Sequence, residues 1–249
     1  MTKEQYGITK ATPSLPARDL LRVPHQGKIL VVSSPAFGPG TYENNVKEMQ
    51  KQYSHSAESP QITFRPATTS ESISAAAYKF GKMAKPQIFD PRWLQTGYIV
   101  RTPEGVFTNT QETDEKILNK MLNKVEKVNG IYLIDDRIAF APYESFRTGV
   151  QDSGDFAEGG LAKALEHTTE KSAPNLREIS SSKFYTRGVN VWGYDKVNEP
   201  IVRVASLDSD WSIDGDGLDV GGCSWGDVDG GYGFGVRDAE GDAQNPKNC

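Results

Sequence analysis

The sequence contains little cysteine, little histidine and no long apolar run. Its two cysteines, Cys223 and Cys249, allow one disulfide at most, which excludes the cysteine framework of small secreted domains. The three histidines, His25, His55 and His167, lie far apart and show no H-x-x-x-H spacing, so the sequence predicts no metal site of the zinc type. No stretch approaches the about 18 apolar residues of a membrane span, so we expect no transmembrane helix.

The N-terminal segment, residues 1–27, lacks apolar periodicity and the continuous apolar core that a signal peptide needs. Its prolines, Pro13, Pro16 and Pro24, favour an extended chain. We therefore expect an N-terminal arm over residues 1–27 and a single domain over residues 28–249. Without a signal peptide, the protein is expected to be a virion component, or else cytoplasmic or displayed by a non-classical route.

Basic residues are nearly missing from the C-terminal part of the chain. Residues 1–206 contain 26 Lys and Arg against 23 Asp and Glu, a net charge of +3. Residues 207–249 contain 2 against 10, a net charge of −8. Since neither part has the basic excess that binds phosphate backbones, we expect no nucleic-acid partner. An acidic surface instead favours partners that carry Lys or Arg.

Apolar periodicity and turn residues predict many short strands. The run at residues 28–33 is typical of a buried strand, and two hairpins are expected at residues 98–108 and 131–140. After Pro174 the pattern indicates only β-structure. Strands are expected there at residues 184–186, 189–192 and 201–205.

Fewer helices are expected. Thr68 and Glu71 have the spacing of a capping box, and Gly81 can end the helix that they start. Helices are predicted after an N-cap at Thr41, over residues 70–80, over residues 114–128 and over residues 155–167. Scattered helices among short strands, with no regular βαβ alternation, predict an α+β fold.

Residues 208–234 have an unusual composition. They contain seven Asp, eight Gly and three Ser, and no Lys, Arg, Glu, Asn, Gln, Thr, Ala, His or Pro. A disordered acidic tail would have few aromatics, whereas this segment has Trp211, Trp225, Tyr232 and Phe234. The segment is therefore expected to fold and to have a specific role.

One hypothesis for this segment is a calcium loop, and with it a calcium-stabilised structural module. Ser212, Asp214, Asp216 and Gly217 fit positions 1, 3, 5 and 6 of such a loop, where oxygen ligands alternate before a glycine turn. The twelfth position, however, falls on Cys223 rather than on a bidentate carboxylate. The match is partial, and calcium remains an alternative to a protein without cofactors.

The other hypothesis is a displayed binding surface. Trp211 with Ile213, and Leu218 with Val220, are spaced by two, so strands can bury these side chains and turn the residues between them outward. Large rings among Gly, Ser and Asp also resemble the composition of antibody paratopes, which combine rigid contact area with adaptable polar groups.

The motifs G-G-C-S-W at residues 221–225 and G-F-G-V-R at residues 233–237 carry a family resemblance. Residues 185–238 resemble the end of C-type-lectin-like domains of the formylglycine-generating-enzyme subtype. The resemblance implies a C-type-lectin-like α+β domain with short mixed strands, hairpins and two to four helices. It also leaves an enzyme of that fold as an alternative function, although Cys223 has no second cysteine near it in sequence.

Within that fold, the segment resembles the variable proteins of diversity-generating retroelements. In that family, adenine-directed mutagenesis converts Asn codons into codons for Asp, Gly, Ser, Tyr or Cys. Asn occurs 11 times in this chain but nowhere in residues 199–244, and those five products make up 20 of the 27 residues at 208–234. The resemblance implies a non-enzymatic protein that binds a macromolecular ligand or host-surface receptor, with a variable region at about 206–237.

The resemblance also divides the segment into contact and scaffold positions. The contact positions that it implies are Ser209, Asp210, Ser212, Asp214, Asp216, Asp219, Cys223, Ser224, Asp227, Asp229 and Tyr232. The scaffold positions are Trp211, Leu218, Val220, Trp225, Phe234 and Val236. No catalytic residue is expected.

Overall fold

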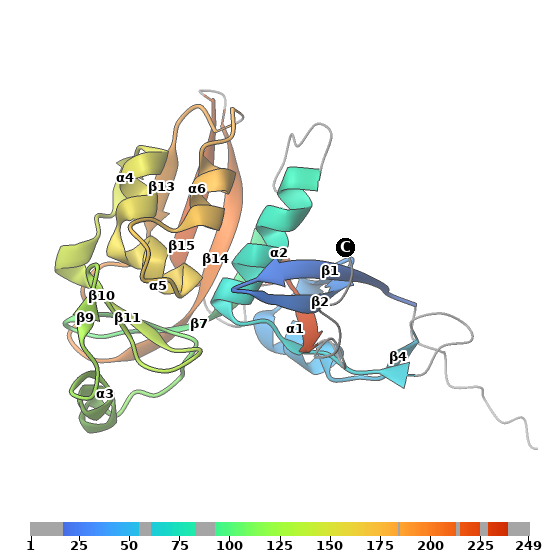
Figure 1. Cartoon of the computed structure of the whole chain (residues 1–249), viewed down its shortest axis with the longest axis horizontal. Helices are drawn as coiled ribbons and strands as arrows, with labels where there is room; N and C mark the ends of the chain where they lie inside the picture. The colour runs from blue at the N-terminus through green and yellow to red at the C-terminus, as the bar shows by residue number, and fades with distance from the viewer. Residues whose placement is uncertain are drawn as a thin grey trace, which may run out of the picture.

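The computed structural model describes residues 17–54, 61–82, 93–183, 185–212, 215–224 and 229–238. Within these ranges, the side chains of residues 54, 61, 80–82, 210–212, 215, 216, 223, 224 and 238 are left out of the description. The described chain forms two sheets, one short strand pair and six α-helices (Figure 1). This architecture confirms the predicted α+β class.

A large mixed sheet forms the centre of the molecule, in the order β12-β13-β15-β14-β7-β8-β11-β10-β9. The pairing of β13 with β15 is parallel, and the other pairings along this order are antiparallel. The strands are β7 (Trp93–Arg101), β8 (Gly105–Thr108), β9 (Lys127–Val128), β10 (Ile131–Leu133), β11 (Ala139–Pro142), β12 (Gly149–Gln151), β13 (Val189–Trp192), β14 (Ile201–Ser212) and β15 (Gly215–Ser224).

The second sheet joins the two ends of the described chain. Its order is β1-β2-β17-β6, so the C-terminal strand pairs with a strand near the N-terminus. Its strands are β1 (Asp19–His25), β2 (Lys28–Ser34), β6 (Arg65–Pro66) and β17 (Gly235–Asp238). Four short strands complete the set: β3 (Phe37–Gly40), β16 (Gly231–Gly233), β4 (Tyr53–Ser54) and β5 (Gln61–Ile62). β16 links β3 to β7.

The sequence predicts an arm as far as residue 27, but the first strand begins earlier. β1 pairs with β2 through a turn in which Gln26 and Gly27 both have positive φ, 46° and 77°. Two consecutive positive φ angles are typical of a tight hairpin turn. Pro24 is tolerated because β1 is an edge strand of its sheet.

α2 (Thr69–Lys82) is the central helix, with buried Ile73, Ala75, Ala76 and Ala77. It contacts β1 of the small sheet, β7 of the large sheet and the helices α5 and α6. The other helices are α1 (Tyr42–Met49), α3 (Glu115–Leu122), α4 (Ser153–Glu158), α5 (Gly160–Glu166) and α6 (Pro174–Ser180), with a short 3-10 turn at Tyr143–Ser145.

Several predicted helix boundaries are wrong. The helix expected over residues 114–128 ends at Leu122, and Lys127–Val128 instead pair with β10 across a turn at Asn129-Gly130. The helix expected over residues 155–167 is two helices divided at Gly159, which has an extended backbone. α2 continues through Gly81, which therefore does not end it.

The expectation of only β-structure after Pro174 is also wrong. Pro174 is the first residue of α6, and Tyr185 belongs to no strand. Proline suits this position because the first helical N–H has no intrahelical partner. With α6 and the division at Gly159, the described residues contain more helices than the two to four expected.

The local signals with a defined hydrogen-bond geometry are confirmed. Thr41 caps α1, and its hydroxyl accepts a hydrogen bond from the Asn44 amide at 3.1 Å. Asp114, at which the sequence predicts a helix to begin, instead caps α3. Both predicted hairpins, β7–β8 and β10–β11, are present. These motifs depend on residues close in sequence, which explains why the sequence alone predicts them.

Candidate functional site

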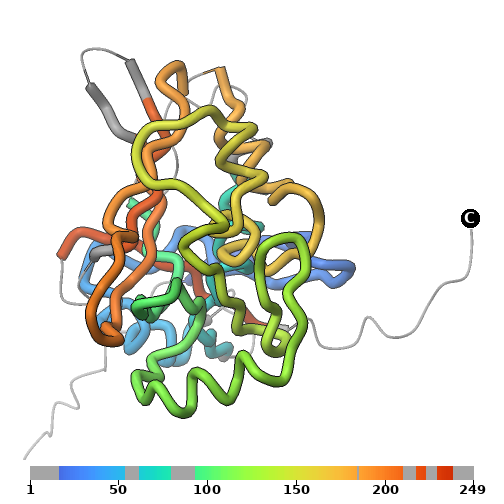
Figure 2. The backbone as a smooth tube through the Cα atoms, turned by 90° about the vertical axis from the view of Figure 1, so that its left-hand side faces the viewer, coloured from blue at the N-terminus to red at the C-terminus, as the bar shows by residue number. Residues whose placement is uncertain are grey.

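The acidic, glycine-rich segment forms most of a long hairpin of β14 and β15. Figure 2 shows these strands side by side in orange. Their register pairs Asp208 with Asp219 and Ser212 with Gly215. β14 also pairs with β7 as far as Asp208, and β15 pairs with β13 from Leu218 onward. Among the described residues, 210–212 and 215–217 have only each other as ladder partners, so the hairpin extends beyond the neighbouring strands.

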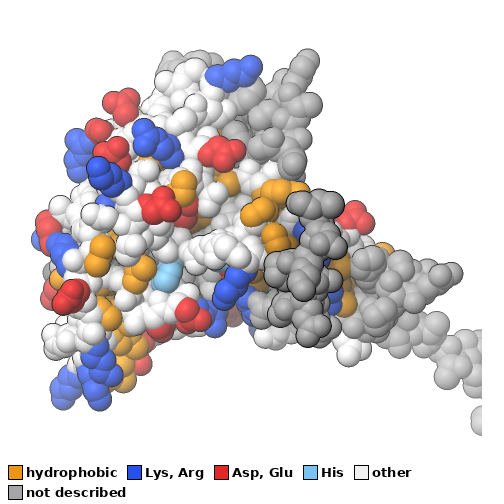
Figure 3. All heavy atoms as spheres, viewed as in Figure 1, with side chains coloured by type: hydrophobic (Ala, Val, Ile, Leu, Met, Phe, Trp, Pro, Cys, Tyr) orange, Lys and Arg blue, Asp and Glu red, His pale blue; other side chains and the backbone are white. Residues whose placement is uncertain are grey.

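One face of this hairpin is covered by helices. Leu207 of β14 and Leu218 and Val220 of β15 are buried in one core cluster with Phe156 of α4 and Leu176 of α6. The helices lie in front of these strands in Figure 1. Successive side chains of a strand point to opposite faces, so this burial fixes the face of every neighbouring residue. On the outer side of these helices, acidic and basic side chains are interspersed (Figure 3).

Ser209 is a predicted contact position, but it lies on the covered face. It is 2% exposed, and its hydroxyl oxygen is 2.8 Å from the Tyr185 hydroxyl. The reason is strand parity: Ser209 is two residues from Leu207 and opposite Leu218. Its side chain therefore stabilises the interior and does not reach a ligand.

The opposite face carries polar side chains in a row across the strands. The register places Asn190 of β13 beside Asp219 of β15, and Asp219 beside Asp208 of β14. The Asn190 side chain donates a hydrogen bond to the Asp219 carboxylate at 3.0 Å. We call Asn190, Trp192, Asp208 and Asp219 the open face. Carboxylates on neighbouring strands lie close together, which gives this face a concentrated negative charge.

Trp192 adds a large ring to the open face. It is 41% exposed at the end of β13, opposite Gly221 of β15. A Cβ at Gly221 would lie 3.1 Å from the Trp192 ring and 2.6 Å from the Ser206 hydroxyl. The absence of a side chain at Gly221 therefore lets the ring lie against the strand.

Neither Trp192 nor Asp208 is among the residues predicted for binding. Both could have been found from the two-residue period, because Trp192 follows the buried Val191 and Asp208 follows the buried Leu207. The prediction missed Trp192 because β13 lies outside the acidic segment. It missed Asp208, the first residue of that segment, because it followed composition and not strand parity.

The remaining predicted positions are distributed as follows. Asp229 is exposed, and Tyr232 is half-buried in β16, where it packs against the main core. The scaffold residues Phe234 and Val236 are buried in that core. The side chains of Asp210, Trp211, Ser212, Asp216, Cys223 and Ser224 lie outside the description, and so do the whole residues Asp214, Trp225 and Asp227.

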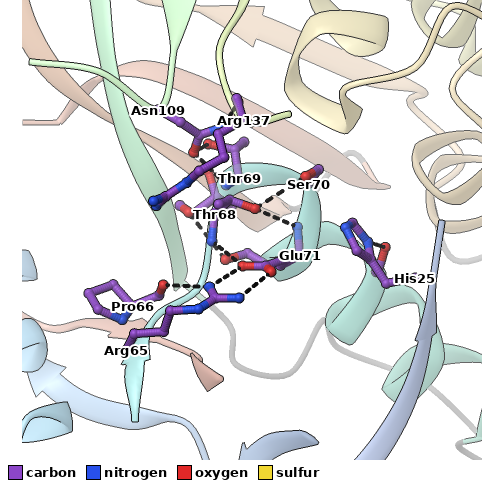
Figure 4. A network of polar contacts seen from close by, with 12 residues as sticks. His25, Arg65, Pro66, Thr68, Thr69, Ser70, Glu71, Asn109 and Arg137 are labelled. Carbon is purple, nitrogen blue, oxygen red and sulfur yellow. Dashed lines mark hydrogen bonds and ion pairs between the residues drawn. The ribbon is translucent and has the colours of Figure 1, made fainter. Parts of the chain in front are cut away.

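A second polar cluster surrounds the start of α2 (Figure 4). The capping box forms as predicted: the Thr68 hydroxyl accepts from the Glu71 amide at 3.2 Å, and the Glu71 carboxylate accepts from the Thr68 amide at 2.8 Å. Arg65 donates two hydrogen bonds of 2.7 Å to the same carboxylate. Burial alone would raise the pKa of Glu71, but the hydrogen bonds from Arg65 and Thr68 outweigh it and lower the pKa below its usual value.

A cavity of about 420 Å³ adjoins this cluster. Its lining includes Tyr42 of α1, Tyr98 of β7, Asn109 after β8 and Arg137 before β11. The rings of Tyr42 and Tyr98 are perpendicular, with centroids 4.9 Å apart. Burial raises the pKa of both tyrosines, so both hydroxyls stay protonated at neutral pH. The sequence did not indicate this cavity, because its walls come from segments far apart in the chain.

The fold brings one histidine beside a serine. A ring nitrogen of His25, Nδ1, lies 2.9 Å from the Ser74 hydroxyl, and burial lowers the pKa of His25. Ser74 is buried on α2 and also receives a hydrogen bond from the Asn175 amide group. His167 instead ends α5, and its ring contacts the Asp135 carbonyl. The Ser74 hydroxyl is buried and has hydrogen-bond partners on two sides, so a substrate cannot reach it. The contact between His25 and Ser74 therefore serves to join α2 to its neighbours.

In the described part of the chain, no three His, Cys, Asp or Glu side chains are grouped closely enough to hold a metal ion. The described helices are all too short or too polar to cross a membrane.

Comparisons with known proteins give no further identification. No protein-family model, no curated protein and no solved structure matches this chain.

Proposed function

We propose that the protein binds a macromolecular ligand, without chemistry, through the open face and the β14–β15 hairpin. The observation that carries this proposal is the separation of side chains by strand parity. Apolar residues such as Leu218 and Val220 point to the helices, whereas Asp208, Asp219 and Trp192 lie on the side away from them. A sheet face of this kind can change its surface residues without changing the residues that support it.

The chemistry of the open face favours a partner with basic groups. Asp208 and Asp219 are adjacent across the strands, and residues 207–249 have a net charge of −8. Trp192 offers a rigid ring beside these carboxylates, and aromatic side chains often supply much of the contact energy at protein interfaces. A receptor surface rich in Lys and Arg matches both features.

We further propose that the hairpin is a variable region of the diversity-generating-retroelement type, on a C-type-lectin-like domain. The absence of Asn from residues 199–244 supports this proposal, and so does the excess of Asp, Gly and Ser at residues 208–234. A near-copy of the DNA for residues 205–237, differing at adenines and located near a reverse-transcriptase gene, would support it decisively. An isolated gene without such a copy would argue against diversification.

A pair of libraries tests the binding role. The first library randomises Asp210, Ser212, Asp214, Asp227 and Asp229, and the matched control randomises Leu218, Val220, Phe234 and Val236. We expect most members of the first library to stay soluble with a nearly unchanged Tm, and most members of the control to unfold. Selection on immobilised lysozyme, a basic protein, should enrich binders from the first library. Equal loss of folding in both libraries would overturn the proposal.

A further inference from the structure

The cavity beside the start of α2 is built from five separate segments. Tyr42 comes from α1, Arg65 and Thr68 from the chain before α2, Tyr98 from β7, and Asn109 and Arg137 from loops of the large sheet. Its volume of about 420 Å³ falls in the range of small-molecule sites. It is separate from the open face, so a ligand here would be additional to the proposed macromolecular partner.

Asn109 holds the cavity wall in place without any ligand. Its backbone has a φ of 55°, and its side-chain oxygen accepts hydrogen bonds from the Thr69 amide at 2.8 Å and the Thr69 hydroxyl at 3.0 Å. Its amide group donates to the Arg137 carbonyl at 2.8 Å. Asn109 therefore ties the Arg137 loop to the start of α2, and a preformed wall of this kind reduces the entropy lost on binding.

The cations of the cavity are not equivalent. Arg65 makes its bidentate ion pair with Glu71, so these two charges cancel locally. The Arg137 guanidinium has no ion pair within the described part of the chain, and Figure 4 shows its side chain extending over the start of α2 near Thr68. The three charges together leave about one positive charge at the cavity. Glu43, which acts on Tyr98 from nearby, further disfavours ligands with several negative charges.

Tyr42 supplies a hydrogen-bond donor at the cavity wall. The residue is 4% exposed and lines the cavity, and no hydrogen bond joins its hydroxyl to another described residue. Among the described residues, the buried polar atoms without a partner do not include this hydroxyl, so a ligand in the cavity can reach it. Because burial keeps this phenol protonated, the hydroxyl can donate to an anion.

We propose that this cavity binds a small organic monoanion, a carboxylate attached to an apolar part about the size of one ring. The Arg137 guanidinium binds the carboxylate, for which its planar fork is well shaped. The Tyr42 hydroxyl donates to the same group. The Tyr98 ring, Val46 and Pro66 contact the apolar part. The single guanidinium of Arg137, without an ion pair among the described residues and with Glu43 close to the cavity, favours a carboxylate over a phosphate dianion.

The test uses the full chain with benzoate and phenylacetate as probes, benzamide as the neutral isostere of benzoate, and inorganic phosphate. Binding is measured by saturation-transfer NMR and by the shift in Tm. A ligand of this size is expected to bind with a Kd of about 1 mM. Benzamide should bind at least about tenfold more weakly, because it lacks the charge that Arg137 binds.

Two variants and one control locate the site. Arg137→Gln should weaken benzoate binding at least about tenfold, and Tyr42→Phe should weaken it about fivefold, while both variants keep their Tm. Arg147→Gln is the matched control, because Arg147 is an exposed arginine that pairs with Asp155 away from the cavity. It should leave binding unchanged.

Any of three results would overturn the proposal. These are no binding of benzoate or phenylacetate, equal binding of benzoate and benzamide, and equal affinity of the parent and Arg137→Gln. If phosphate bound more tightly than benzoate, the assignment of a carboxylate ligand would be wrong and a phosphate ligand would take its place in the proposal. Failure here leaves the library experiment on the hairpin unaffected, because the two sites share no residue.

Discussion

The two faces of the β14–β15 hairpin have opposite surroundings although alternate residues of the same strands build them. Leu207, Leu218 and Val220 pack under α4 and α6, whereas Asp208 and Asp219 form a charged row on the other side. The difference shows that one segment can encode stability and surface chemistry separately. A substitution in it should therefore act according to its face rather than its position along the chain.

Truncation of a buried side chain should give the largest difference between the faces. We expect Leu218→Ala to lower the free energy of unfolding by about 3 kcal/mol, because it leaves a cavity in the core. Its neighbour Asp219→Ala removes a half-buried carboxylate that accepts a hydrogen bond from Asn190, and it should cost less than about 1 kcal/mol. Urea unfolding of both variants measures the contrast. Similar losses for the two would show that the open face is part of the core.

The second largest effect on stability should depend on pH, and it comes from a carboxylate that is buried among the helices. Desolvation raises the pKa of Glu166 from 4.5 to about 7, although the Asn175 and Leu176 amides donate hydrogen bonds to it. The folded state therefore binds this proton more tightly than the unfolded state. The resulting stability is present below pH 4.5 and is lost as the pH rises to about 7, by up to about 3 kcal/mol.

Glu166→Gln isolates this contribution from other groups such as His25, whose lowered pKa acts in the opposite direction. The free energy of unfolding of the parent should fall relative to that of the variant between pH 4.5 and 7, as urea titrations at each pH would record. Parallel pH profiles for the two proteins would mean that Glu166 stays ionised in the fold.

Gly221 and Gly222 are adjacent in β15 and lie on opposite faces, so alanine substitutions at them should show the same difference in stability with smaller effects. A Cβ at Gly222 would lie 2.6 Å from the ring of Tyr194, which is fully buried, so Gly222→Ala should cost about 2 kcal/mol. At Gly221 the crowding atoms are the half-exposed Trp192 ring and a hydroxyl, which can move, so Gly221→Ala should cost about 1 kcal/mol. Thermal unfolding decides between them, and a reversed order would contradict the assignment of the two faces.

Removing charge from the displayed segment should have the smallest effect on stability. We expect the combined change of Asp210, Asp214, Asp227 and Asp229 to Ser to shift Tm by less than about 2 °C, because surface substitutions rarely alter stability. Asp216 is kept, because it pairs with Trp211 and has the strand parity of the buried Leu218. Calorimetry with calcium and with a chelator is the control. A large loss of Tm, together with a chelator effect in the parent protein, would instead support the calcium-stabilised module.

Motifs with local geometry could be predicted from the sequence. The capping box of Thr68 and Glu71, the cap at Thr41 and the two hairpins all depend on residues within a few positions of each other. α6 could not be predicted in this way. The amides of its first turn, at Asn175 and Leu176, are bound by the Glu166 side chain from another helix, so its N-terminus is stabilised by a tertiary contact.

The end of α3 was missed for a related reason. Apolar residues continue with helical spacing as far as Val128, but residues 127–128 pair with β10 instead. Local periodicity cannot weigh that pairing against another helical turn. In the candidate site, the predicted burial of Leu218 and Val220 is confirmed, but the sequence predicted no hairpin there, placed Ser209 on the wrong face and missed Trp192.

The sequence by itself determined the α+β class, the caps and hairpins, and the segment where Asp, Gly and aromatic residues accumulate. Each of these follows from composition or from contacts between near neighbours. Only the tertiary structure decided which face of that segment is open, that β13 contributes Trp192 to it, and that Tyr42 and Arg137 share a cavity. The physical reason is that the burial of a side chain and the neutralisation of its charge depend on partners that are far apart in the sequence. Only tertiary packing brings these partners together.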